Sequence, residues 1–433
     1  MAAKNEPAGL ALRLVAIERL RTVLGGSNFS PITAAELADS RDRAIANRLV
    51  TTALRRHGHL NLVIENLLER GMPSKSGSFE ATLRLSLAQL LYLPDLGDHS
   101  ALYLAVEALR RDKRATHLAG LMNAMLRRAQ KERERLLEPP PALLFPEALR
   151  KAWQNAYGVE AVGRFAAALL AGTPLDLTLK TSDPALLEAL GAEALLADTV
   201  RIQNRDKAVD ALPGYAEGQW WVQDVAAALP ARLIDLPQGA SVLDLCAAPG
   251  GKTAQLVKAG YKVTALDNDA GRLGRLRANL QRLHYDAEIV EADAATFAPE
   301  QKFDAVLLDA PCSATGTFRR HPEVIWHREQ SDIAGRVKLQ QKLIARAAEC
   351  LKPGGILIYC VCSLEAAEGE SQAAWALSNV PGLKPEPIGA EELGGLERAV
   401  TGEGTVRTHP GLALPNRLAG SLDGFFIARF RRI

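Results

Sequence analysis

Two short segments place a cysteine directly after an apolar run that is typical of a buried strand. DAPCSATG (residues 309–316) follows KFDAVLL, and VCSLE (residues 361–365) follows GGILIYC. If the two strands are neighbours in a parallel sheet, Cys312, Cys362 and Asp309 meet at one edge of it. Paired cysteines at successive strand ends favour a nucleophilic site. The alternative, a small buried apolar side chain, is what we expect of the other cysteines: Cys246, Cys350 and Cys360.

These groups suit methylation of a cytosine ring at carbon 5, which is a poor nucleophile in the aromatic ring. A thiolate that adds to carbon 6 makes carbon 5 enamine-like, so that it can attack a methyl sulfonium. The carboxyl group of Asp309 can face ring nitrogen 3 and the exocyclic amine. Loss of the carbon-5 proton and elimination of the thiolate then release the product, and a second cysteine can assist. The residues alone leave open which cysteine attacks.

The segment DLCAAPGGKT (residues 244–253) ends like a phosphate-binding loop. Such a loop needs a glycine four intervening residues before its Gly-Lys-Thr, because backbone amides must wrap the phosphates. That position is Cys246, and Pro249 lacks an amide donor where one is wanted. The segment therefore does not predict a nucleoside triphosphate site.

Two aspartates close the strands that follow this loop. Asp267 ends VTALD, where a carboxylate can accept hydrogen bonds from ribose hydroxyls, and Asp293 ends IVEAD, where it can face an adenine amino group. Each aspartate alone could equally be a helix cap. As a set without provision for pyrophosphate, the loop and both aspartates predict an S-adenosylmethionine site.

The elements that position these residues divide the chain into three expected domains. Residues 1–140 carry apolar residues at three- and four-residue spacing, with breaks at 25–31, 71–78 and 93–100, which predicts an all-α bundle. Residues 141–215, after a proline-rich boundary, predict a small α+β connector with strands at 175–180 and 199–203. Residues 216–433 alternate short apolar strands with helices, which predicts an α/β, Rossmann-like domain with a mostly parallel seven-stranded sheet.

Composition and charge indicate a globular protein with an uneven charge distribution. The chain has 433 residues, of which 48% are hydrophobic, and a net charge of +2. Residues 1–140 hold 21 Lys and Arg against 15 Asp and Glu, so they carry +6 and the rest carries −4. This favours a nucleic-acid-binding arm on an enzyme core, although solvated helices look similar. The candidate phosphate contacts are Arg110, Arg111, Lys113, Arg114, Arg319, Arg320 and His321; an exposed basic turn is the structural alternative for the last three.

Other features of the sequence indicate where the protein is located and whether it binds a metal ion. The start of the chain has the pattern of neither a secretory leader nor a membrane span. Five cysteines without framework spacing argue against a disulfide scaffold, so we expect a cytoplasmic protein with reduced thiols. No spacing typical of metal ligands is present, and we expect no metal.

Several motifs resemble those of a known family. DLCAAPGGKT, ALDND, EAD, DAPCSATG with RRHPE behind it, the CS of VCS, and DGFFIARF resemble, in order, the motifs of RNA (cytosine-5)-methyltransferases. RDRAIANRLV, RLSLAQLLYL and LMNAMLRR resemble a NusB-type RNA-binding bundle. The pairing resembles the Fmu/Sun family of ribosomal RNA small-subunit methyltransferase B proteins, over nearly the whole chain.

The resemblance implies roles for individual residues. It makes Cys362 the nucleophile, Cys312 the residue that assists product release, and Asp309 the residue that recognises cytosine. It implies S-adenosylmethionine as cofactor, with Lys252 near its methionine carboxylate, and unpaired or flipped-out small-subunit rRNA as substrate. The implied cofactor contacts are Cys246, Ala247, Ala248, Pro249, Gly250, Gly251, Lys252, Asp267, Asp293 and Asp309. We expect a monomer.

The sequence departs from the family pattern at three places. Val361 stands where the family usually has Thr, ENE becomes Glu368-Gly369-Glu370, and HPGLALPNRLAGS (residues 409–421) occupies a stretch that is often shorter.

The alternative functions are an enzyme that methylates tRNA or another RNA, and a non-catalytic RNA-binding or antitermination factor. A DNA methyltransferase would need a sizeable target-recognition domain, for which no segment is visible.

Overall fold

The computed structural model describes residues 7–137, 139–203, 208–327, 330–414 and 421–433. Two compact units make up the chain: Met1–Leu170 with His321–His327, and Ala171–Arg320 with Arg328–Ile433. This division differs from the three expected domains. Helices α8 (Glu147–Tyr157) and α9 (Val159–Ala171) of the expected connector fall in the first unit, except Ala171 at the end of α9. Its strands and helix α10 (Pro184–Leu190) belong to the second unit.

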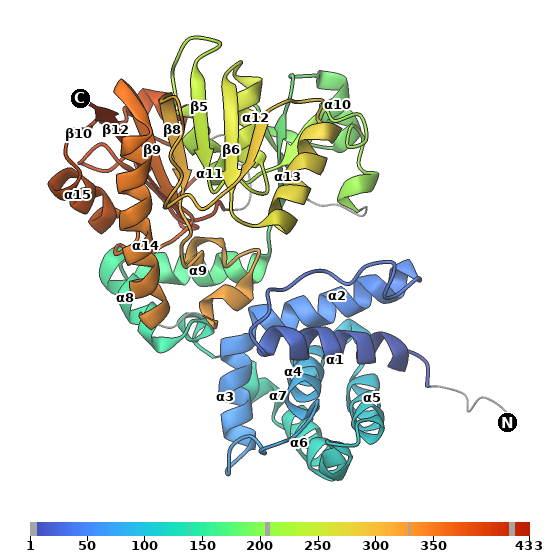
Figure 1. Ribbon diagram of the computed structural model, residues 1–433. Coiled ribbons are helices and arrows are strands. Elements are labelled where there is room, and N and C mark those ends of the chain that lie inside the picture. The colour runs from blue at the N-terminus through green and yellow to red at the C-terminus, as the bar shows by residue number, and fades with distance from the viewer. Residues whose placement is uncertain (1–6, 138, 204–207, 328–329, 415–420) are drawn as a thin grey trace. The chain divides into compact units, whose positions relative to one another are not determined.

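The first unit is a helical bundle, as predicted (Figure 1). Its helix α4 is buried on nearly all sides, because Leu83, Leu85, Leu87 and Leu90 point to different neighbours around the helix axis. The predicted breaks at 25–31 and 71–78 fall between helices and are confirmed, whereas the break at 93–100 overlaps the start of α5 at Asp98. The helices are α1 (Leu10–Leu24), α2 (Ser40–Arg55), α3 (His57–Leu67), α4 (Phe79–Tyr92), α5 (Asp98–Arg111), α6 (Ala119–Lys131), α7 (Arg133–Leu136), α8 (Glu147–Tyr157) and α9 (Val159–Ala171).

A short segment from much later in the sequence belongs to this first unit. It contains the 3-10 helix η6 (Pro322–Ile325). The backbone amide of Phe29 donates to Oε1 of Glu323 at 2.9 Å, and the rings of His57 and Trp326 lie 4.4 Å apart. The HPE part of the RRHPE motif therefore packs with the helical unit, and its two arginines belong to the second unit.

The second unit begins with a small antiparallel sheet in the order β2-β3-β1-β4. The predicted strands at 175–180 and 199–203 are confirmed as β1 (Leu175–Leu179) and β3 (Thr199–Ile202). Two strands of this sheet were not predicted: β2 (Glu193–Leu196), whose EALL continues a helical pattern, and the three-residue β4 (Trp220–Val222). Helix α10 (Pro184–Leu190) connects β1 to β2.

The large sheet carries the predicted strand-helix alternation (Figure 1). In the described part of the chain its main path has the order β10-β12-β9-β8-β5-β6-β7, and β11 pairs with β12. Strands β5 to β9 are mutually parallel, whereas β12 is antiparallel to β9, so the mostly parallel sheet is confirmed. Among the described residues it has eight strands rather than the seven predicted, because β11 pairs with β12 beside the main path. The strands are β5 (Ser241–Leu245), β6 (Lys262–Asp267), β7 (Glu288–Glu291), β8 (Phe303–Asp309), β9 (Leu351–Val361), β10 (Leu383–Pro385), β11 (Val406–Thr408) and β12 (Phe425–Arg432).

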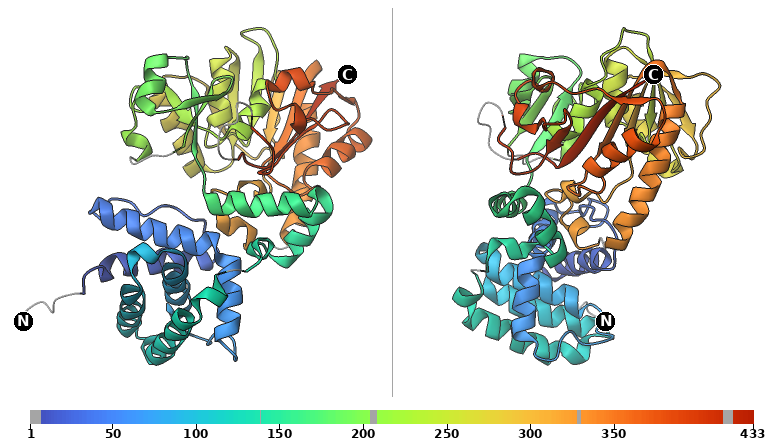
Figure 2. Two further views of the ribbon diagram at one scale, coloured as in Figure 1. Left: turned by 180° about the vertical axis from the view of Figure 1, so that it is seen from behind. Right: turned by 90° about the vertical axis from the view of Figure 1, so that its left-hand side faces the viewer.

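Helices cover both faces of this sheet (Figure 2). Alternate strand residues point to opposite faces: Leu308 joins the core under α14 and α15, and Leu307 joins the core under α11 and α12. Helix α13 packs on the α12 side through Leu273 and Leu276. The helices are α11 (Val225–Arg232), α12 (Gly251–Lys258), α13 (Ala270–Arg282), α14 (Gln330–Glu349) and α15 (Glu370–Asn379).

The strand order reverses at β5 and β8, whose carboxyl ends lie side by side. From β5 the chain builds β6 and β7 toward one side, and β8 and β9 then lie on the other side of β5. Ligands of open α/β sheets bind where the strand order reverses in this way. The predicted catalytic and cofactor-binding residues lie at the ends of β6 and β8 or in the segments that follow β5, β7, β8 and β9. Within the ranges described above, no helix is long and apolar enough to cross a membrane.

Candidate active site

The two cysteine loops meet at the carboxyl ends of β8 and β9. These strands are parallel neighbours with Asp309 opposite Cys360 in register. The Sγ atoms of Cys312 and Cys362 lie 3.5 Å apart, and the amide of Gly316 donates to the carbonyl oxygen of Cys362 at 3.0 Å. The expected convergence of the two loops is confirmed.

The two thiols differ in their surroundings. Cys312 is buried, and Cys362 is half-buried. The hydrogen bond with Cys362, together with burial and then the charges of Cys362 and Glu368, raises the pKa of the Cys312 thiol well above its ordinary value. Cys312 therefore stays protonated at neutral pH.

Lys252 and Asp309 form an ion pair beside the cysteines. Nζ of Lys252 donates to Oδ2 of Asp309 at 2.7 Å, and Sγ of Cys360 donates to Oδ1 at 3.5 Å. Burial disfavours the charged lysine, but the charge of Asp309 more than compensates, so the pKa of Lys252 lies above its ordinary value. The ammonium group of Lys252, which we expected near the methionine carboxylate of the cofactor, is thus paired with Asp309. Cys360, expected to be only an apolar side chain, contacts this aspartate.

The loop between β5 and α12 is held by contacts with the next strand and helix. The amide of Ala247 donates to the carbonyl of Leu266 at 3.0 Å, and that of Ala248 donates to Oδ2 of Asp267 at 3.2 Å. Gly250, with φ +100°, ends the loop, and a Cβ there would lie 3.0 Å from Cγ of Leu276. The chain at Cys246 is itself left-handed, with φ +61°. No phosphate-wrapping loop forms here, in agreement with the sequence.

Three carboxylates lie at or next to the carboxyl ends of β5, β6 and β7. Asp267 is buried at the end of β6, and Asp293 is exposed after β7, where its Oδ1 accepts from the amide of Ala295 at 2.9 Å. Burial raises the pKa of Asp244 to about 7, although Thr253 donates to its Oδ2 at 2.6 Å. Its Oδ1 is buried without a hydrogen-bond partner. Acceptors at three successive strand ends fit the hydroxyl and amine donors of an adenosyl amino acid.

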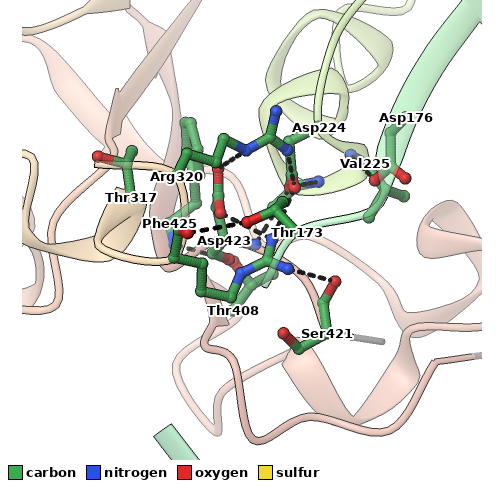
Figure 3. Close-up of polar contacts among 12 residues, drawn as sticks. Thr173, Asp176, Asp224, Val225, Thr317, Arg320, Thr408, Ser421, Asp423 and Phe425 are labelled. Carbon is green, nitrogen blue, oxygen red and sulfur yellow. Dashed lines mark hydrogen bonds and ion pairs between the residues drawn. The ribbon is translucent and has the colours of Figure 1, made fainter. Parts of the chain in front are cut away.

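The prediction that Arg319 contacts RNA phosphates disagrees with its position. Figure 3 shows the neighbouring Arg320 with its side chain directed toward Asp224 and Asp423. The side chain of Arg319 is fully buried and donates to Asp224 at 2.9 Å, to Asp423 at 2.7 Å and to the carbonyl oxygen of Ser421 at 2.9 Å. Arg320, 22% exposed, pairs with both carboxylates. Burial works against the charge of Asp224, but Arg320 and then Arg319 hold its pKa below the ordinary value. For Arg319 the prediction is wrong, because its guanidinium is used inside the protein.

The remaining predicted RNA contacts lie at the surface of the first unit. His321 is exposed and its Nδ1 lies 3.4 Å from Oε1 of Glu323. The four basic residues of the other cluster are also exposed, and they surround Asp112, which accepts from the amides of Ser78 and Arg114. These residues are Arg110, Arg111, Lys113 and Arg114.

One buried residue of the site was not anticipated. The carboxylate of Glu368 accepts hydrogen bonds from Ser313 and Ser363, the residues that follow the two cysteines. The repeated Cys-Ser pair was a visible signal for such a shared partner. In the part of the chain that the structure describes, no group of three or more His, Cys, Asp or Glu side chains could hold a metal ion. Within the unusual loop of residues 409–421, residues 415–420 lie outside the described residues.

Fold and site together define a doubly wound methyltransferase domain preceded by a helical unit of NusB type. Residues 231–431 match the family described as 16S rRNA methyltransferase RsmB/F, and residues 13–131 match the NusB family. The chain is 38% identical over 411 residues to ribosomal RNA small subunit methyltransferase B of Xanthomonas campestris, covering 90% of this chain and 93% of that one. The same-named protein of Pseudomonas putida is 34% identical, with 97% and 98% covered.

Solved structures share this fold. The crystal structure of PH0851 matches with a TM-score of 0.78 and 23% identity, covering 100% of both chains. A methyltransferase homologue from Pyrococcus horikoshii matches with a TM-score of 0.56 and 26% identity, covering 68% of this chain and 98% of that one.

The chain belongs to the RsmB/F family of 16S rRNA methyltransferases. It is an RNA methyltransferase whose cofactor is S-adenosylmethionine, and both predictions are confirmed.

Proposed function

We propose that the protein methylates carbon 5 of one cytosine of small-subunit rRNA through a covalent adduct with Cys362. The observation that carries the proposal is the pair of sulfur atoms 3.5 Å apart, beside the ion pair of Lys252 with Asp309. A nucleophile, a partner thiol and an oriented carboxylate are the groups that this chemistry needs.

In this proposal the two thiols have separate roles. The Cys362 thiolate adds to carbon 6, forming an S–C6 bond, and carbon 5 becomes nucleophilic. After methyl transfer, carbon 5 loses its proton to a base and the S–C6 bond breaks. Since the pKa of Cys312 is raised, by its hydrogen bond with Cys362 first and by burial second, its protonated thiol can donate to the departing sulfur. This assignment agrees with the family resemblance.

Asp309 orients the base in this scheme. The salt bridge with Lys252 fixes the direction of its carboxylate, with Cys360 on the other oxygen. The carboxyl group then meets ring nitrogen 3 and the exocyclic amine, which holds carbon 6 against Cys362. Fixed geometry of this kind raises the rate by bringing the reacting atoms into contact.

The loop of residues 246–252, with Asp267 and Asp293, is proposed to hold the cofactor. S-adenosylmethionine supplies the methyl group as a sulfonium when bound. Asp267, at the end of β6, is proposed to accept hydrogen bonds from the ribose hydroxyls, and Asp293, after β7, is proposed to face the adenine amino group. Asp244 provides a buried acceptor in the same wall.

The exposed basic cluster of Arg110, Arg111, Lys113 and Arg114 is proposed to contact RNA phosphates, with His321 as a further contact. The functional division would then be RNA binding by residues 1–140, a connector at 141–215 and catalysis by 216–433. We infer that the protein acts as a monomer in the cytoplasm, where its free thiols stay reduced.

Bisulfite mapping of rRNA from cells with and without the protein tests this function. We expect one 5-methylcytosine signal in small-subunit rRNA to disappear without the protein and to return with the wild-type chain. The Cys362→Ala variant is expected not to restore it. Restoration by that variant would contradict the assignment of the nucleophile, and loss of a signal only in tRNA would contradict the substrate.

A further inference from the structure

Glu368 is a buried carboxylate at the back of the two cysteine loops. It lies in the turn between β9 and α15 and is fully buried. Its Oε2 accepts from Oγ of Ser313 at 2.5 Å and from Oγ of Ser363 at 2.6 Å. Its Oε1 accepts from the amide of Ser313 at 2.9 Å and from Nε2 of Gln340 at 3.1 Å. All of these donors are uncharged groups.

A carboxylate in such a position is costly unless its oxygens are well hydrogen-bonded. Here the donors converge from three separate elements: the loop after β8, the loop after β9 and helix α14. Gln340 also donates to the carbonyl of Pro311 at 3.0 Å, so the helix holds the same loop at a second point. Removing the acceptor would take away the one carboxylate that all three elements share.

The contacts reach the reacting sulfurs through one residue on each side. Ser313 follows Cys312, and Ser363 follows Cys362. The two serine hydroxyls lie 3.0 Å apart and share one carboxylate oxygen. A shift of either serine therefore moves the neighbouring cysteine, and the separation of the two sulfurs depends on Glu368.

We propose that Glu368 is a positioning residue that sets the separation of Cys312 and Cys362 for the proposed methyl transfer. It acts through Ser313 and Ser363 and touches neither the base nor the cofactor. This role rests on the proposed function of the two cysteines.

Replacement by glutamine keeps the size of the side chain but turns one acceptor oxygen into an NH2 donor. That donor would face the hydroxyl and amide donors of the serines or the amide of Gln340, and the cluster must rearrange. A displacement of about 1 Å at reacting groups can lower a rate by about 10²-fold. We therefore expect Glu368→Gln to slow attack on carbon 6 by about 10²-fold. The loop of residues 246–252 does not depend on this carboxylate, so affinity for S-adenosylmethionine should stay within about twofold.

The test uses the full chain and a 16S rRNA transcript in which 5-fluorocytidine replaces cytidine. Fluorine at carbon 5 cannot leave as a proton does, so the covalent protein–RNA adduct accumulates and its rate of formation is read on a denaturing gel. Glu368→Gln, Ser363→Ala, Ser313→Ala and the double variant Glu368→Gln/Ser363→Ala are compared at saturating cofactor. The cofactor dissociation constant and the melting temperature are measured for each. The matched control is Glu386→Gln, since Glu386 pairs with Arg431 away from the cysteines.

We expect slow adduct formation by Glu368→Gln and by Ser363→Ala, with cofactor affinity unchanged and the control at the wild-type rate. The double variant should be no slower than Glu368→Gln alone, because both changes remove the same contact. A wild-type rate for Glu368→Gln, or a loss that follows cofactor affinity, overturns the proposal. If Glu368→Gln does not fold, a wild-type rate for Ser363→Ala overturns it. No adduct with the wild-type chain would overturn the proposed function itself, and the role of Glu368 with it.

Discussion

Replacing Arg319 with methionine should destabilise the protein rather than weaken its binding to RNA. Methionine keeps an unbranched apolar stem but removes the guanidinium, which donates to Asp224, Asp423 and the carbonyl oxygen of Ser421. Both carboxylates are buried, with 3% of each residue exposed. The substitution therefore leaves buried negative charges with fewer partners.

The size of the effect follows from the ion pairs that are lost. Removing one partner of a buried pair costs about 3–5 kcal/mol. Arg320 still pairs with Asp224 and Asp423, so we place the loss near the lower end of that range. For a unit of this size, about 3 kcal/mol corresponds to a fall in melting temperature of about 6–12 °C.

Thermal unfolding and RNA binding at low temperature, measured on the same preparations, separate the two possibilities. The control is Arg398→Ala, because Arg398 is an exposed arginine whose loss should change stability by less than about 0.5 kcal/mol. We expect Arg319→Met to melt early while the folded fraction binds RNA as tightly as the wild type. A normal melting temperature with weakened RNA binding would refute the structural role and restore the phosphate contact.

Three further predictions concern pH, loop packing and RNA contact. Burial raises the pKa of Asp244 from an ordinary value near 3.8 to about 7 in the folded protein. Between these two pH values the carboxyl group ionises in the unfolded chain but stays protonated in the folded one. The free energy of unfolding is therefore unaffected by this group below about pH 4 and falls as the pH rises to about 7. Asp244→Asn should remove this fall of roughly 4 kcal/mol in the free energy of unfolding, measured by denaturant titrations from pH 4 to 8. If the variant kept the pH dependence of the wild type, the raised pKa of Asp244 would be contradicted. Gly316→Ala should slow single-turnover methyl transfer and cost about 1–3 kcal/mol, because its Cβ would lie 2.0 Å from the carbonyl oxygen of Gly424; wild-type rate and stability would speak against this packing. Lys113→Ala with Arg114→Ala should weaken RNA binding and reduce its salt dependence by about one unit per lost phosphate contact, whereas an equal slope would exclude these contacts.

The sequence predicts which residues lie at the strand ends better than it predicts the long-range side-chain contacts that support them. Cys312, Cys362 and Asp309 could be placed together because each follows an apolar strand, and parallel strands present their carboxyl ends at one edge. The order of helices and strands also follows from local patterns of apolar residues. Strand β2 escaped notice because its EALL continues the helical pattern before it, and β4 because three residues carry too little periodicity.

Long-range side-chain pairing could not be predicted from one sequence. Arg319 looked like an exposed residue, since arginine is almost never fully buried unless it is paired. Its partners Asp224 and Asp423 lie 95 and 104 residues away. Glu368 is separated from Ser313 by 55 residues, and no local pattern indicates that the two must touch. Such pairs appear only once the fold has placed the loops side by side.

The central claim is that Cys362 attacks the base and Cys312 assists its release. Incubating Cys312→Ala with unmodified 16S rRNA and S-adenosylmethionine, followed by proteolysis and mass spectrometry of the RNA-linked peptide, tests this most directly. We predict a denaturant-stable adduct attached to the peptide that contains Cys362, and none with Cys362→Ala. An adduct that forms in Cys362→Ala through Cys312 would contradict the account.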